Sequence, residues 1–130
     1  MTITAYSVML APTVTVQVPN NSQTVIVRLR LPNAGSFVVF GRIVITNQSA
    51  SAANAGVMLT TFDGETVLDQ ASATIGGGSF TGVFLQGILT MGTQNVNEIV
   101  DIRCFVNANV SVNCISLNAI SVDATASGLA

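Results

Sequence analysis

The stretch LRLPNAGSFVVFGRIVITN, residues 29–47, predicts two β-strands joined by a turn at PNAG. Its first part ends a predicted strand over 24–31, where aliphatic residues alternate with Arg28 and Arg30, so one face of this strand is expected to meet water. Its second part is apolar at nearly every position except Arg42. A strand of that kind must be covered on both faces. We expect one cover from the domain's own second sheet and the other from another subunit.

The rest of the chain repeats this pattern without a helical stripe. Runs rich in Val, Ile, Thr and Phe are divided by clusters of Pro, Gly, Asn and Ser, which is typical of an all-β sandwich or barrel. Such runs predict a two-sheet antiparallel β-sandwich, a jelly roll, with a tight hairpin at Asp63-Gly64. The expected strands lie near residues 3–10, 13–18, 24–31, 36–46, 55–62, 66–75, 80–91, 97–106 and 110–122.

The composition indicates a chain that does not act alone. Its 130 residues suit one domain, yet 49% are hydrophobic and 8% are charged, against about 25% charged in an ordinary soluble domain. A small monomer cannot bury so many apolar residues and still cover its surface with polar groups. The composition therefore predicts an oligomer.

The charge pattern makes some partners unlikely on physical grounds. The net charge is −2, and the four arginines, at 28, 30, 42 and 103, form no basic stripe, so nucleic acid is not expected as a partner. Polar residues interrupt every apolar run well before about 18 residues, which argues against membrane insertion. The first residues do not read as a signal peptide. We nevertheless favour a secreted, cell-surface or virion-surface location for such an assembly.

Four segments together carry a resemblance to a known family. They are LRLPNAGSFVVFGRIVITN, VLDQASATI, FTGVFLQGILTM and VDIRCFVNANVSVNCISLNAISVD. This series resembles the tumour-necrosis-factor-like jelly roll, which includes complement globular heads, and particularly its small bacterial and phage-associated members. The resemblance covers residues 24–123. Residues 1–23 would add N-terminal strands and a loop, and 124–130 a flexible tail, within a single domain over 1–130.

The resemblance implies a homotrimer around a threefold axis, and it says little about activity. The receptor-binding loops of the cytokines have no counterpart in this chain. The function expected is therefore that of a non-enzymatic structural or trimerisation head, in a surface, fibre or secreted assembly.

Residues able to carry catalysis are scarce. Without His or Lys the chain lacks the usual general base and Schiff-base amine. Asp63, Glu65 and Asp69 gather around the predicted DG turn, but their spacing fits no calcium loop, and a solvated turn is the preferred interpretation. We expect no enzyme activity, no cofactor and no metal site.

Five residues are predicted at a subunit interface: Phe40, Arg42, Asp101, Arg103 and Phe105. On the predicted strand over 97–106, Asp101 and Arg103 share a face with Phe105, and this mixture of charge and apolar surface suits a partly buried contact. We expect Arg42 to pair with an acid such as Asp101 or Glu98 near that contact.

Arg28 and Arg30 support a second hypothesis, a trimeric lectin or receptor-binding head with carbohydrate or protein sites between subunits. Both arginines lie on the predicted wet face and could hold a hydroxyl or carboxylate. Keeping that face soluble is the alternative role, and we prefer it.

Cys104 and Cys114 lie five residues on either side of Asn109. If two strands pair across that point, the thiols would be opposite each other and could form a disulfide. The alternative is two small buried thiols in a reduced protein. Asn-x-Ser sequons occur at Asn20, Asn47 and Asn109, each in a predicted loop.

Overall fold

The computed structural model describes residues 4–32, 35–61, 65–91 and 98–122. They form nine strands: β1 (Ala5–Met9), β2 (Val16–Val18), β3 (Ser22–Leu31), β4 (Gly35–Asn47), β5 (Ala53–Thr61), β6 (Thr66–Ile75), β7 (Phe80–Met91), β8 (Glu98–Val106) and β9 (Val110–Val122). No helix long and apolar enough to cross a membrane occurs in these ranges. The predicted hairpin at Asp63-Gly64 and the predicted tail at 124–130 lie outside the described residues.

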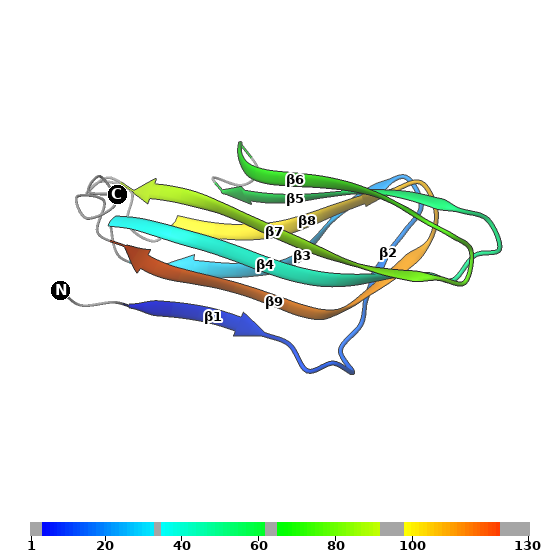
Figure 1. Cartoon of the computed structure of the whole chain (residues 1–130), viewed down its shortest axis with the longest axis horizontal. Coiled ribbons are helices and arrows are strands. Elements are labelled where there is room, and N and C mark those ends of the chain that lie inside the picture. Colours follow the sequence, from blue (N-terminus) through cyan, green and yellow to red (C-terminus); the bar gives the residue numbers. More distant parts are fainter. Residues whose placement is uncertain (1–3, 33–34, 62–64, 92–97, 123–130) are drawn as a thin grey trace.

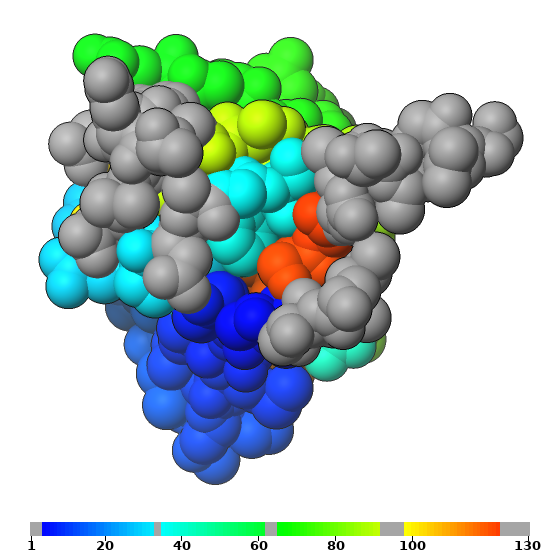
Figure 2. Space-filling model, turned by 90° about the vertical axis from the view of Figure 1, so that its left-hand side faces the viewer, coloured from blue at the N-terminus to red at the C-terminus, as the bar shows by residue number. Residues whose placement is uncertain are grey.

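The strands form two antiparallel sheets that face each other (Figure 1). One has the order β1-β9-β4-β7, with β2 also pairing with β9, and is called the β4 sheet; the other has the order β3-β8-β5-β6 and is called the β8 sheet. From β3 onward the chain moves repeatedly between the two sheets, which is the topology of a jelly roll. Seen from one end in Figure 2, β1 in blue lies at one border of the molecule, with β4 in cyan further inward. The predicted fold class is confirmed.

Strict alternation along the strands builds the core. On β4, Phe37, Val39, Ile43 and Ile45 are buried, and on β8 so are Val100, Ile102, Cys104 and Val106. These side chains point between the sheets, where each large one contributes about 1.5–3 kcal/mol relative to an exposed position. The pattern predicted for 24–31 also holds, except that a bulge between Val25 and Val27 lets Ile26 become buried as well. Both arginines of that strand remain exposed.

Asn47 ties together one end of the sandwich. It was expected in a loop, but it is the last residue of β4 and has no exposed surface. Its Nδ2 group donates to the carbonyl oxygens of Ser51 at 2.7 Å and Ile75 at 2.9 Å, and its Oδ1 accepts from the N–H of Ser49 at 3.0 Å and the hydroxyl at 2.7 Å. Since this nitrogen is buried and hydrogen-bonded, the sequon at Asn47 is closed to a glycan in the folded chain.

The two other sequons lie together at the surface. The backbone N–H of Asn20 donates to Oδ1 of Asn109 at 2.8 Å, and both residues are exposed. These asparagines therefore join the segment before β3 to the connection between β8 and β9.

Of the two alternatives for Cys104 and Cys114, the structure has the free thiols, because the strand pairing that a disulfide requires does not occur. β8 and β9 belong to different sheets, so residues 107–109 carry the chain across the sandwich instead of closing a hairpin. Both thiols are free: Cys104 points into the core, whereas Cys114 is half-buried in β9, at a bulge opposite β4, with a positive φ of 52°. The turn sequence Asn-Ala-Asn suits both a hairpin and a crossing between sheets, so it does not distinguish them.

Burial raises the pKa of the Cys104 thiol from 9.0 to about 11. The folded chain therefore keeps this proton at a pH where the unfolded chain releases it, and stability is lost as the pH rises through 9 toward 11. Between pH 8 and pH 10 we expect the free energy of unfolding to fall by about 1 kcal/mol from this thiol alone. Urea unfolding of the wild type and Cys104→Ala, both under reducing conditions, measures the difference. An equal pH dependence in the two proteins would contradict the assignment.

At one edge of the sandwich, the edge strands β6 and β7 connect the two sheets. The backbone N–H of Gln86 donates to Oδ2 of Asp69 at 3.0 Å, which links the two sheets. Beside this bond β6 comes so close to β7 that a Cβ added at Gly87 would lie 2.8 Å from the Cβ of Leu68. Only glycine fits this contact without a shift of the neighbouring strand.

Candidate functional site

The outer face of the β4 sheet carries exposed apolar side chains, chiefly on its edge strand β7, beside a more polar row of Ser and Asn on β9. Pairing registers place the outward positions of β1, β9, β4 and β7 in common rows, such as Ile120, Val38 and Ile88. This surface is called the association face. It carries five of the eight large hydrophobic side chains that are exposed in the described chain: Met9 at 76%, Phe80 at 74%, Phe84 at 59%, Ile88 at 70% and Val122 at 37%. Because exposed apolar residues are normally scattered singly, such a cluster indicates a contact surface.

Arg42 lies within this apolar face. It is exposed, and the registers place Phe84 on one side of it and Ser116 on the other, with Met9 beyond Ser116. Among the described outward residues of the β4 sheet it is the one charged side chain, and it makes no ion pair within the described chain. Phe40 shares this face and is half-buried.

The outer face of the β8 sheet carries Arg28, Arg30, Asp101 and Arg103. Asp101 is only 2% exposed, and its carboxylate accepts from Nε and NH2 of Arg103, each at 3.1 Å. Nε of Arg28 lies 3.8 Å from Oδ2 of Asp101, and the hydroxyl of Thr60 donates to Oδ1. A buried carboxylate needs such compensation to remain charged. Asp101 is thus fully engaged within its own chain.

Within a single chain Arg42 does not pair with Asp101, one of the two acids expected for it at a subunit contact. Asp101 lies on the outer face of the β8 sheet and Arg42 on the outer face of the β4 sheet, so the sandwich separates them. The five predicted interface residues divide in the same way. Phe40 and Arg42 share the association face, whereas Asp101, Arg103 and Phe105 lie on the opposite side of the molecule.

The arginines proposed for ligand binding lie on β3 in the β8 sheet. The side chain of Arg28 is 56% exposed and is drawn toward Asp101, while Arg30 is exposed one row further along. The carboxylates considered for a metal do not gather. Glu65 is exposed, Asp69 binds the N–H of Gln86, and Asp63 is outside the described residues. The described part of the chain holds no group of three or more potential metal ligands.

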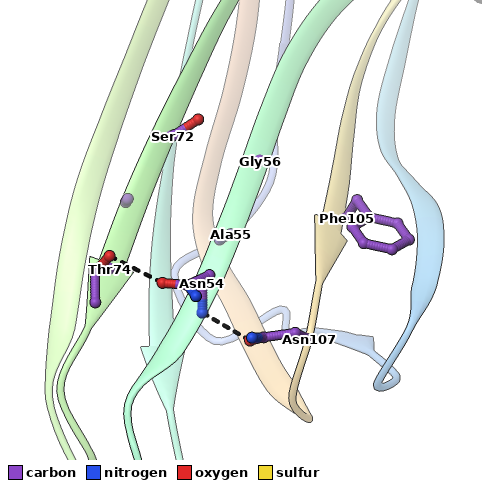
Figure 3. A pocket seen from close by; sticks show the side chains of 8 residues that line it. Asn54, Ala55, Gly56, Ser72, Thr74, Phe105 and Asn107 are labelled. Atoms are coloured by element: carbon purple, nitrogen blue, oxygen red, sulfur yellow. Dashed lines mark hydrogen bonds between the residues drawn. The ribbon is translucent and has the colours of Figure 1, made fainter.

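The same β8 sheet also carries a shallow hollow of about 350 Å³ over Gly56 (Figure 3). Phe105 of β8 lines one side, with its ring turned toward β3 in Figure 3, and Ser72 and Thr74 of β6 line the other. A second hollow of about 230 Å³ shares Gly56, Ser72 and Phe105 with the first and adds Met58 and Gln70. The two together are called the Gly56 trough.

Two asparagines build one end of this trough. Oδ1 of Asn54 accepts from the hydroxyl of Thr74 at 2.9 Å, and Oδ1 of Asn107 accepts from the backbone N–H of Asn54 at 2.7 Å. Figure 3 shows Asn54 between Thr74 and Asn107. This trough could not be predicted from the sequence, because its position depends on which three strands lie side by side. The only signals in the sequence were a glycine within a strand, Gly56, and a phenylalanine on a face shared with charged residues, Phe105. From the sequence, Phe105 is predicted at a subunit interface.

Neither a protein-family model nor a curated protein sequence matches this chain. Similar folds occur among solved structures. A protein of infectious bursal disease virus, in virus-derived T=1 particles, has a TM-score of 0.55 and 14% identity over 92% of this chain. Murine APRIL, a TNF-family member, has a TM-score of 0.58 and 8% identity over 92% of this chain and all of its own. A cyclase from Fischerella sp. TAU has a TM-score of 0.51 and 17% identity over 71% of this chain and 54% of its own.

At such low identities these likenesses concern the fold and not the activity. The chain spans 32% of the viral protein in the T=1 particles, so it corresponds to about a third of that chain. A particle protein, a TNF-family member and a cyclase thus share one architecture with this chain. The fold established by the topology and by these comparisons is a jelly-roll β-sandwich, which a TNF-family member shares.

Proposed function

We propose that this chain is a non-enzymatic head domain that forms a homotrimer through its association face. The observation that carries the proposal is the clustering of exposed Phe80, Phe84 and Ile88 on one strand, beside Met9 and Val122 on the same face. Covering these side chains with another copy would remove them from water at about 25 cal/mol per Å². Assembly would then account for the high proportion of hydrophobic residues in the chain.

The position of Arg42 supports the same proposal. The guanidinium of Arg42 has Phe84 on one side and Ser116 on the other, so it can lie along the Phe84 ring and donate to acceptors of a neighbouring copy. Arginine is enriched in the buried centres of interfaces for this reason. The strongly polar β8 sheet would remain on the outside of the assembly.

A threefold arrangement is favoured by the resemblance to tumour-necrosis-factor-like jelly rolls and by the structural likeness to a TNF-family member. A closed ring of three copies leaves no apolar face open to further growth, in contrast to an open chain of contacts. Such a head would serve a surface, fibre or secreted assembly. The scarcity of candidate acids and bases in the sequence supports a role without catalysis.

Sedimentation equilibrium tests the proposal directly. We expect a single species of about 40 kDa at micromolar concentration, three times the chain mass of 13.4 kDa. A mass of 13.4 kDa would refute association, and a stable dimer would refute the threefold arrangement.

A further inference from the structure

We propose that the Gly56 trough binds a neutral saccharide, with one pyranose ring lying over Gly56 against Phe105. The trough is on the β8 sheet, opposite the association face, and every residue that lines it comes from one chain. The inference therefore does not rest on the homotrimer. A trimer would carry three separate sites, in contrast to a site shared between subunits.

The strand register gives the trough its dimensions. Phe105, Gly56 and Ser72 stand in one row across β8, β5 and β6. With strands about 4.8 Å apart, the backbones that carry the two sides are separated by about 10 Å, which admits a single sugar ring. The floor is open because a Cβ built at Gly56 would have no atom within 4 Å.

Phe105 provides the apolar contact that a sugar requires. Its side chain is 46% exposed and stands among small and polar neighbours, unlike the clustered rings of the association face. The C–H face of a pyranose packs against an aromatic ring and brings its hydroxyl groups to the ring's edge. In Figure 3 the ring is turned toward β3, so a sugar over Gly56 would stack on it once the Phe105 side chain turns toward β5. The sugar hydroxyls would then face Ser72 on one side and Asn54 and Asn107 at the end of the trough.

The asparagines are arranged to donate. Because Oδ1 of Asn54 and Oδ1 of Asn107 already accept hydrogen bonds, their orientation is fixed, and each Nδ2 group lacks an acceptor within the described chain. The hydroxyl of Ser72 can both donate and accept, as a sugar hydroxyl can.

The absence of charge selects the class of ligand. No side chain lining either hollow is charged in the described structure, so an anion or a cation would find no counterion there. An apolar peptide would find a single ring and mainly polar neighbours. A neutral polyhydroxylated ring matches both kinds of surface.

Titration of the ¹⁵N-labelled full chain with methyl glycosides tests the proposal. The probes are the methyl α- and β-glycosides of glucose, galactose, mannose, fucose and N-acetylglucosamine, each at up to about 20 mM. For at least one probe we expect saturable shifts at Gly56, Ser72, Phe105 and Asn107, with a dissociation constant of about 1 mM. No shift with any probe, or shifts confined to other residues, would overturn the proposal.

Two glycines provide matched variants. Gly56→Val should fold, since its Cβ meets open space and valine suits a strand, but it fills the trough and should weaken binding at least about tenfold. Gly82→Val makes the same change on the association face of the other sheet. Because every residue that lines the trough comes from one chain, this variant should leave the sugar affinity unchanged whether or not it alters assembly. Phe105→Ala should also weaken binding at least about tenfold. Equal affinity in wild type and Gly56→Val would refute the site, and a peptide binding with the same Gly56 dependence while sugars fail would refute the ligand class.

Discussion

Ile88→Glu is expected to turn the assembly into monomers, with association weakened at least about 100-fold. The side chain of Ile88 is 70% exposed in the single chain, so the replacement removes little packing within the fold. In a covered association face the new carboxylate would lose its water without gaining a partner, a penalty of several kcal/mol. Sedimentation equilibrium of the variant should give the mass of one chain, with unchanged circular dichroism.

Val67→Glu is the matched control for this experiment. Val67 is a β-branched residue of β6 in the β8 sheet, and it is 45% exposed. The same new charge there should leave the association constant within about twofold. Assembly that survives Ile88→Glu but not Val67→Glu would move the interface to the opposite side of the sandwich.

Asn47→Ala is expected to lower the free energy of unfolding by about 3–4 kcal/mol. The replacement leaves the carbonyl oxygens of Ile75 and Ser51 without their donor and removes the acceptor that holds Ser49. Each unsatisfied buried group costs about 1–3 kcal/mol, and the segments after β4 and β6 lose their common attachment. Chemical unfolding monitored by circular dichroism measures the loss.

Asn109→Ala is the matched control, because it removes an asparagine side chain at an exposed position. Asn109 is exposed and accepts one hydrogen bond, from the N–H of Asn20, which water can replace. Its cost should stay below about 1 kcal/mol. Equal losses at the two positions would show that the buried network around Asn47 adds nothing.

The strands could be predicted from the sequence because each shows a local pattern of apolar residues bounded by turn residues. Alternation on the strand over 97–106 separates Val100 and Ile102 from Asp101 and Arg103, and the structure follows it residue by residue. Turn residues such as Pro32 bound the runs, so the nine strand positions agreed with the structure to within a few residues. Such patterns depend only on neighbours in the chain, which a sequence contains.

The arrangement of strands between the sheets could not be predicted in the same way. A turn at 107–109 is compatible with a hairpin and with a crossing between sheets, so the sequence leaves open whether Cys104 and Cys114 lie opposite each other. The sequence also shows which residues share a face of one strand, but not to which of the two sheets the strand belongs. It therefore could not show that Arg42 and Asp101 lie on opposite outer faces of one chain. The Gly56 trough needs the register of β8, β5 and β6, which no local pattern records.

The bond from the N–H of Gln86 to Asp69 has a consequence for how this apolar chain avoids fibres. β7 is the last strand of its sheet, and an exposed edge of alternating Phe and Ile would be a template for strand addition by another copy. The Asp69 carboxylate takes up one donor of that edge, and the close approach of Leu68 to Gly87 covers the backbone beside it. In the proposed homotrimer, copies would then meet through contacts between side chains, which can close into an assembly of fixed size, and not through open-ended strand pairing.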